Sequence, residues 1–406
     1  MAVTLMVNNA LQKKRVPIPG AISTIGVGIA AGAVATLFPQ INRNTFQKLE
    51  DKSARQFVLV FIAPIVFAEG YGIKSRQFFE NITRILTHAF VGTFVSAMVV
   101  AILVCYLPPL TGAFKGEPGL TFAESLAFGA MISSTDPVTT LAIFKEQQMV
   151  ENGLSYLYYS VLGESILNDA VAITLYSSLG GIVQAGEHLT FSASMRILQS
   201  FCATFAGSTL IGAFSGTLTA MILKVARLGA GAHEAEEHFY FNVPEVGVAL
   251  VLAYVPFLVA EACELSGIVA IMFAGITMRR YAHYNLTEVT RHIFLPTVEL
   301  IASLCETYVF VLLGLGVFLL RSAYSLPLIG WAIVGCLLGR AAHVYPLSWL
   351  VNRCSSGPRL TLSEQHVVWF SGLRGAMGFT CALGFPSERH RDLVLCTTVV
   401  VVGFTL

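Results

Sequence analysis

The chain has 406 residues, of which 55% are hydrophobic and only 12% are charged. A soluble globular protein has about twice that charged fraction, so the composition excludes an ordinary soluble domain. The net charge of +1 argues against a nucleic-acid partner.

Apolar runs of about 20 residues recur along the whole sequence, and this is the length that an α-helix needs to cross a bilayer. We therefore predict an all-α polytopic membrane protein. If the chain starts in the cytoplasm, more Lys and Arg residues of the connections fall on the cytoplasmic side than on the other, as the positive-inside rule requires. Twelve spans are expected, at 17–38, 56–71, 82–107, 120–148, 155–183, 192–224, 238–257, 260–281, 291–320, 325–353, 361–386 and 391–406.

The fourth expected span is interrupted by a proline. The stretch SSTDPVTT places Asp136 directly before Pro137. Proline removes a helical hydrogen bond and disfavours the α conformation of the residue before it. Irregular backbone at membrane depth is tolerated only where it is buried in protein or lines a cavity. A proline kink capped by its own hydroxyl groups is the alternative, but an Asp at the kink favours a functional break.

The fifth expected span contains the stretch LGESILNDAVAI, from 162 to 173. At helical spacing, Glu164 and Asn168 share one edge of the helix, and Ser165 and Asp169 share the next edge. An ionisable group at membrane depth costs about 2.5–3.5 kcal/mol on insertion scales and indicates a functional site. The alternative is a buried polar cluster that only fixes helix packing, which does not need two acids within six residues.

Asp136 and Asp169 lie on adjacent spans joined by a short connection, and we expect them to meet near the middle of the membrane with Thr135. Carboxylate, hydroxyl and amide oxygens suit Na⁺, Li⁺, K⁺ or H⁺ and not soft metals, so no bound metal and no cofactor is expected. A carboxyl group that binds either a proton or a cation, never both, couples their movements. Asn168 is neutral, which predicts one proton per cation and no net current.

The eleventh expected span contains WFSGLRGAMGF, in which three glycines surround Arg374: Gly372, Gly375 and Gly378. Glycine permits irregular backbone, so a second break is expected here. A buried Arg needs an anionic partner. We expect Arg374 to pair with Glu164, which would leave Asp169 free to titrate.

The fourth and eleventh spans run in opposite directions across the membrane. Two interrupted helices of opposite sense point to an inverted-repeat transporter whose site lies where the breaks cross. Glu306 and Arg340 each lie inside a late span, and we expect them to form a second buried pair, structural in the first place and a gate or pH sensor in the second.

Seven stretches resemble, in order, the membrane domain of the eukaryotic sodium/proton exchangers, within the monovalent cation/proton antiporter superfamily. They are FVLVFIAPIVFAEGY (57–71), FGAMISSTDPVTTLAIF (128–144), LGESILNDAVAI (162–173), LSGIVAIMFAGITMRRY (265–281), CETYVFVLLGLGVF (305–318), GRAAHVYPLSWLVN (339–352) and WFSGLRGA (369–376). The CET, GRA…PLS and WFSGLRGA forms look most like the endomembrane and apical branch of that family.

The resemblance implies roles for the same residues. Asp169 would be the carboxylate that binds the cation and the proton, with Asn168 as its partner. Three further residues would contribute to the site: Thr135, Asp136 and Ser165. Glu164 and Arg374 would form a buried ion pair. The FAEGY form displaces Glu69 by one place, which turns it about 100° around the helix, so no role in selectivity is carried over to it.

The resemblance also implies a fold with a mobile core domain, which moves like an elevator, and a dimerisation domain. We expect a single transmembrane exchanger domain over 1–406, with core spans at 82–183 and 325–406 and scaffold spans at 17–71 and 192–320. The first family helix and a cytosolic tail are expected to lie outside this chain.

The sequence thus predicts a secondary active antiporter, not an enzyme, that exchanges Na⁺ or K⁺ for H⁺ and regulates pH and cation balance. Its expected partners are these ions, membrane lipid and a second copy, in an endomembrane (Golgi or endosome) or the plasma membrane. One alternative is an intramembrane aspartyl protease with two acids sharing a proton, although neither Asp lies in a GxGD-type context. A passive cation channel is the other.

Overall fold

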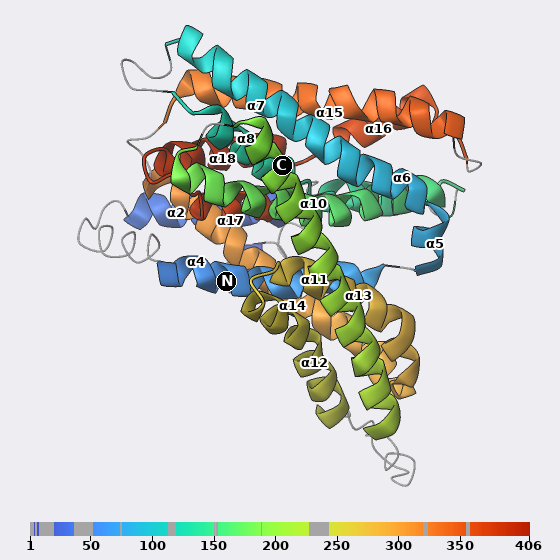
Figure 1. The fold of residues 1–406 in the computed structure, drawn as a ribbon. Coiled ribbons are helices and arrows are strands. Elements are labelled where there is room, and N and C mark those ends of the chain that lie inside the picture. Colours follow the sequence, from blue (N-terminus) through green and yellow to red (C-terminus); the bar gives the residue numbers. More distant parts are fainter. Residues whose placement is uncertain are drawn as a thin grey trace. The chain divides into compact units, whose positions relative to one another are not determined.

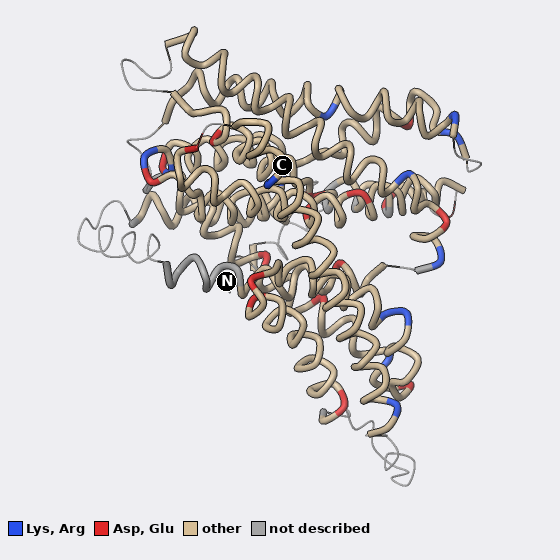
Figure 2. Tube along the Cα trace, viewed as in Figure 1, with Lys and Arg blue, Asp and Glu red and all other residues tan. Residues whose placement is uncertain are grey.

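The computed structural model describes residues 4, 6–7, 20–35, 52–73, 75–112, 119–149, 151, 153–187, 189–226, 243–319, 324–354 and 358–406. In these residues all regular structure is helical, which confirms the predicted fold class (Figure 1). Charged side chains are sparse along the helices (Figure 2). Six segments are long and apolar enough to cross a membrane, at 82–110, 155–185, 191–226, 244–262, 288–317 and 326–354.

Each of the twelve expected ranges contains at least one described helix. The helices are α2 (Gly20–Ala35), α4 (Lys52–Gly72), α5 (Ser75–Glu80), α6 (Ile82–Leu86), the π-helix η1 (Thr87–Gly92), α7 (Thr93–Leu110), α8 (Phe122–Ile132), α9 (Val138–Glu146), α10 (Ser155–Ala185), α11 (Phe191–Ala226), α12 (Val243–Ala262), α13 (Gly267–Thr277), the π-helix η2 (Met278–Ala282), the 3₁₀-helix η3 (His283–Asn285), α14 (Glu288–Leu319), α15 (Leu326–Cys354), α16 (Leu362–Phe370), α17 (Ala376–Leu383) and α18 (Arg391–Thr405).

The chain forms two compact units, each built from separate stretches of sequence. The first comprises Met1–Val58, Glu80–Gln199 and Thr307–Leu406, and the second comprises Leu59–Phe79 and Ser200–Glu306. Both ranges expected for the core domain fall in the first unit. The expected scaffold range 17–71 is divided between the units, because α2 belongs to the first. The assignment of the units as mobile core and dimerisation scaffold stays a prediction.

In the first unit α7 packs against both α8 and α15, and α10 packs against α8. Small and branched residues at helical spacing form one fully buried stripe of α7: Ala97, Val100, Ala101 and Val104. Lipid tails are as apolar as these side chains, so the packing is stabilised by close approach and not by removal from water. The approach is very close, since a Cβ on Gly129 of α8 would lie 2.3 Å from the Ala97 carbonyl oxygen.

Both predicted breaks are present in the first unit. Residues 133–137 separate α8 from α9, and residues 371–375 separate α16 from α17, without helical structure. The helix before each break starts with the same capping box, formed by Thr121 with Glu124 in α8 and by Thr361 with Glu364 in α16. The two short helices therefore begin in the same way, and each has a serine as its C-cap, Ser133 in α8 and Ser371 in α16.

In the second unit α12 packs against α13. A buried carboxylate ties the start of α12 to the start of α14. Glu245 accepts a hydrogen bond from the Thr287 backbone N–H at 3.1 Å, and its other oxygen accepts from the hydroxyls of Thr287 at 2.6 Å and Thr290 at 2.5 Å. These bonds supply the partners that a buried carboxylate needs.

Candidate functional site

The first break lies beside the polar stretch of α10. The side-chain amide of Asn168 donates from Nδ2 to the Ser133 carbonyl at 2.9 Å and to the Thr135 hydroxyl at 3.1 Å. Its Oδ1 accepts a hydrogen bond from the hydroxyl of Thr93, on α7. Ser165, one turn earlier, donates to the Thr135 carbonyl. The amide and hydroxyl groups of α10 thus satisfy backbone and side-chain groups that the interrupted helix leaves open.

The two breaks touch each other through their backbones. The Asp136 backbone N–H donates to the Leu373 carbonyl at 2.8 Å. A Cβ added to Gly375 would lie 2.4 Å from the Asp136 Cβ and 2.6 Å from its Oδ2, so only glycine fits at this position without a shift. The crossing that the sequence predicts is therefore a direct contact between residues 136 and 373–375.

Asp169 lies on α10 beside this crossing, and one of its carboxylate oxygens differs from the neighbouring polar groups in having no hydrogen bond within the described part of the chain. Its Oδ1 is buried, yet it has no hydrogen-bond partner among the described residues. The Ser134 hydroxyl and the Thr135 backbone lie beside the same carboxylate, so Asp169 faces the polar groups of the first break. A buried carboxylate oxygen without a donor is costly, so this atom stands out among the polar groups of the first unit.

Arg374 does not pair with Glu164, which corrects the predicted ion pair. Its Nη1 donates to the carbonyls of Ser133 at 2.8 Å and Ser134 at 3.3 Å, directly after the end of α8. The partner of Glu164 is instead Arg340 of α15, with Nη1 at 2.5 Å from Oε1 and both side chains 5% exposed.

Arg340 also reaches the second break. Its Nη2 donates to the Val368 carbonyl at 2.8 Å and to the Ser371 hydroxyl at 3.4 Å, at the end of α16. The last carbonyls of a helix carry partial negative charge and lack partners inside the helix. One buried Arg thus compensates each interrupted helix end, Arg374 for α8 and Arg340 for α16. Backbone carbonyls thus stabilise the buried guanidinium of Arg374, which has no salt bridge to a carboxylate among the described residues.

The predicted pair of Glu306 with Arg340 is wrong, because the described contacts of Arg340 are with Glu164 and with three other residues of the first unit: His343, Val368 and Ser371. Glu306 lies in α14 and closes the second unit in sequence. Glu69 lies half-buried in α4, and its position adds no role to the site.

Sequence reasoning missed two contributors to the site. Thr93 lies in an apolar run with no motif around it, so no signal marked it. Arg340 was recognised as an intramembrane cation but was given the wrong partner. The repeated pattern of Thr and Glu three residues apart, TFAE at 121–124 and TLSE at 361–364, was available and indicates two equivalent helix starts before the breaks.

Comparisons with known proteins identify the family of the chain. The family model "Sodium/hydrogen exchanger, transmembrane" matches residues 1–406. The chain is 34% identical to human "Sodium/hydrogen exchanger 8" over 395 residues, covering 96% of this chain and 64% of that protein. It is 32% identical to "Sodium/hydrogen exchanger 5" of Arabidopsis thaliana, covering 100% of this chain and 75% of that protein. The chain thus spans somewhat less than two thirds of the length of the human relative.

A solved structure has the same fold. The sodium proton antiporter MjNhaP1 from Methanocaldococcus jannaschii, at pH 8, superposes with a TM-score of 0.70, covering 100% of this chain and 91% of that one, at 16% identity. This match confirms the antiporter fold, while the family match rests on the whole-length model and on the relatives above 30% identity. The chain is therefore a multi-pass membrane protein of the sodium/hydrogen exchanger family, a family of transporters and not of enzymes.

Proposed function

We propose that this protein exchanges Na⁺ or K⁺ for H⁺ across a membrane, one for one, and that Asp169 is the carboxylate that carries either ion. The observation that supports the proposal most directly is the buried, unpartnered Oδ1 of Asp169 beside the contact between the two breaks. Hard oxygen donors within that region suit a monovalent cation.

The surrounding groups divide into those that hold the backbone and those that could bind an ion. Asn168 and Ser165 are engaged with the Ser133 and Thr135 carbonyls, so they fix the shape of the first break. The Thr135 hydroxyl, which also accepts a hydrogen bond from Asn168, and the carboxylates of Asp136 and Asp169 are the oxygen atoms from which we propose that a cation site is built. A bound cation and a bound proton would then compete for Asp169.

The stoichiometry follows from the charge balance. Glu164 is neutralised by Arg340 at 2.5 Å, and Arg374 compensates the end of α8. The residue beside Asp169 is a neutral amide. In the proposed cycle Asp136 keeps its charge and Asp169 alone changes its charge, so one proton would replace one monovalent cation without net current.

The membrane setting is part of the same proposal. We propose alternating access of the Asp169 site, with the first unit as the mobile core, in a homodimer located in an endomembrane or the plasma membrane. Such exchange would regulate pH and cation balance. The relatives named sodium/hydrogen exchangers support the ions.

The test is proton flux in liposomes that contain the purified protein, with Na⁺, Li⁺ or K⁺ added in turn. Asp169→Asn removes the titrating group and keeps the size of the side chain, so cation-driven proton movement should fall to the level of empty liposomes. Asp392→Asn changes an exposed carboxylate at the start of α18 and should leave the flux unchanged.

The outcomes separate the proposal from its alternatives. Flux that is insensitive to membrane voltage and absent in Asp169→Asn supports one-for-one exchange. Voltage-dependent coupling would overturn the stoichiometry, and cation flux that persists in Asp169→Asn would indicate a passive channel. Cleavage of a reporter peptide that depends on Asp136 and Asp169 would indicate an intramembrane protease.

A further inference from the structure

A column of stacked side chains crosses one end of the second unit. The Arg279 guanidinium lies over the ring of Tyr71, 5.5 Å from its centroid. Tyr71 stacks on Phe67 at 5.8 Å and meets Phe294 edge-on at 5.0 Å. A cation over an aromatic face is attracted by the ring quadrupole, and the contact leaves most of the guanidinium N–H donors available.

The Tyr71 hydroxyl and Arg279 converge on one histidine. Tyr71 Oη lies 2.9 Å from His283 Nδ1, and Arg279 Nη1 lies 3.3 Å from the same atom. Burial, with the nearby cations Arg279 and Arg291 and then His292, lowers the pKa of His283 to about 4. The imidazole is neutral at cellular pH, so it accepts hydrogen bonds and adds no positive charge of its own.

The surface beside this column is basic and aromatic. Arg280 is exposed and has no charged or hydrogen-bonding partner among the described residues. Tyr281 and Tyr284 are 55% and 68% exposed. No Asp or Glu occurs between 278 and 287, and Glu288 is the first acid after them. This connection lies on the predicted cytoplasmic side, where anionic lipids attract Lys and Arg close to a span and Tyr favours the interface.

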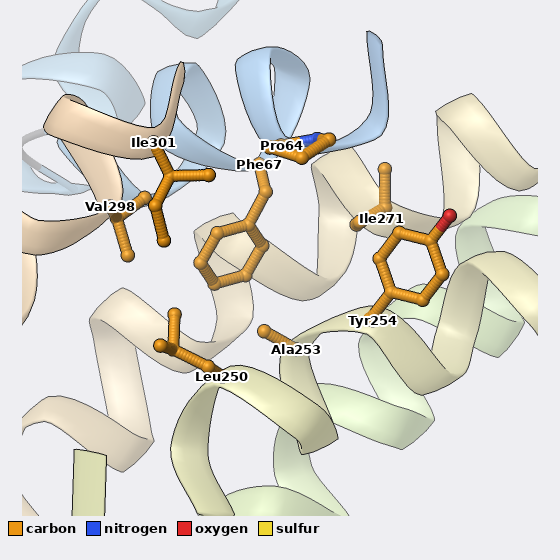
Figure 3. A pocket seen from close by; sticks show the side chains of 8 residues that line it. All are labelled: Pro64, Phe67, Leu250, Ala253, Tyr254, Ile271, Val298 and Ile301. Atoms are coloured by element: carbon orange, nitrogen blue, oxygen red, sulfur yellow. The ribbon is translucent and has the colours of Figure 1, made fainter. Parts of the chain in front are cut away.

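The other end of the column opens on an apolar cavity of about 170 Å³ within the second unit (Figure 3). Phe67 projects into it, and the other lining residues are aliphatic except for one tyrosine: Pro64, Leu250, Ala253, Tyr254, Ile271, Val298 and Ile301. An apolar cavity of about 150 Å³ stays dry and holds a group of the size of benzene. This cavity therefore fits a length of hydrocarbon chain and not a whole drug-sized ligand.

The depth of the cavity matches a lipid. Ile271 precedes Arg279 by eight residues, and Val298 follows Arg291 by seven, so the cavity lies about 10–12 Å along the two helices from the arginines. The polar layer of a bilayer is about 5–8 Å thick on each side. A phosphate at the arginines therefore places the upper part of an acyl chain beside the cavity.

We propose that the second unit binds one anionic phospholipid, with its phosphate on Arg280 and Arg279 and part of an acyl chain in the cavity lined by Phe67. Guanidinium groups bind phosphate through paired, charge-assisted hydrogen bonds. The lipid would stabilise the packing of α4, η2 and α14, which the column joins. All the residues of this site belong to the second unit, and the proposal does not depend on the exchange activity.

The experiment is native mass spectrometry of the purified full chain after addition of phosphatidylserine or phosphatidylcholine, with soluble glycerophosphoserine as a competitor. We expect retained phosphatidylserine, little retained phosphatidylcholine and no displacement by the soluble headgroup. Arg280→Gln removes a guanidinium that would bind the phosphate, so it should reduce retention at least fivefold. Because Arg280 is exposed, the substitution should not impair folding. Ala253→Met, which fills the cavity with a flexible side chain, should also reduce it.

Arg353→Gln is the matched control, since Arg353 is another Arg at a helix end, stacked on Trp349 at 4.4 Å in the first unit. Equal loss in this variant, or equal retention of the two lipids, would indicate nonspecific attraction and overturn the proposal. Full competition by glycerophosphoserine would indicate a free phosphate site. If Arg280→Gln abolishes retention but Ala253→Met leaves it unchanged, the phosphate contact would stand and the proposed acyl-chain position in the cavity would be overturned.

Discussion

The two breaks share an architecture but differ in chemistry. Each follows a short helix that starts with a Thr–Glu capping box, and each helix end is met by a buried Arg. The first break contains an acid and hydroxyl groups between 133 and 137, whereas the second contains glycines and Arg374 between 371 and 375. One break therefore supplies oxygen ligands, and the other supplies close approach and positive charge.

The difference between the two arginines is instructive. Arg340 contacts both a helix end and the carboxylate of Glu164, while the Arg374 guanidinium donates to the carbonyls of Ser133 and Ser134 and also contacts the side chain of Cys336. A full negative charge is thus stably neutralised at the second break. At the first break the Arg374 charge is shared between backbone carbonyls and an electrostatic interaction with Asp169, which in our proposal is the carboxylate that changes its charge.

The largest effect is expected from separating the buried pair. Arg340→Gln leaves Glu164 as an uncompensated charge with 5% exposure and should lower the unfolding free energy by about 3–5 kcal/mol. Denaturant unfolding in detergent measures it. Arg340→Met combined with Glu164→Leu removes both charges and should recover most of the loss; a double variant as unstable as the single one would contradict a paired role.

A smaller effect is expected at the first break. Arg374→Gln removes two charge-assisted hydrogen bonds to carbonyls but strands no carboxylate, so it should cost about 1.5–3 kcal/mol in the same unfolding assay. The comparison of the two arginines would fail if Arg374→Gln cost as much as Arg340→Gln, because that result would require a carboxylate partner for Arg374.

The contact between the breaks is tested by adding one methyl group. Gly375→Ala would place a Cβ 2.4 Å from the Asp136 Cβ, and overpacking of this kind costs about 1–3 kcal/mol. Gly378→Ala is the matched control, since its Cβ would meet the Met131 carbonyl oxygen at an ordinary 3.5 Å. Proton flux and unfolding should both change in the first variant only. Equal behaviour of the two would mean that the breaks separate easily.

The smallest effect is expected at the support of the amide. Thr93→Val removes the hydroxyl that donates to Asn168 and should cost about 1 kcal/mol. Thr398→Val, which removes a hydroxyl bond to the Val394 carbonyl inside α18, is the control for the loss of a buried hydroxyl. The first variant should also alter the apparent cation affinity in the flux assay, whereas the control should not.

Much of the fold follows from local signals in the sequence. Hydropathy predicted the helices, and Pro137 and the glycines around Arg374 predicted both breaks. The partners of the arginines were not predictable in the same way. Two intramembrane arginines and several acids allow more than one pairing, and the choice depends on how α10 and α15 are rotated against each other, which only tertiary packing decides.

Some residues of the site could be predicted from local sequence, and others only from tertiary packing. The polar stretch of α10 identified Asn168 and Asp169 without structural help. Thr93 could not be identified, because a threonine in an apolar helix bonds its own backbone in most cases, and this one also bonds the Ala89 carbonyl. Its role arises only because α7 lies beside α10.

The contact of Arg374 with Ser133 spans 241 residues of sequence. At about 5–20 residues per second, a ribosome needs roughly 10–50 s to make the chain between them. During that interval the end of α8 lacks the cation that later compensates it, and the site cannot be assembled. The contact between the two breaks is therefore one of the last features of the first unit that can form as the chain is made.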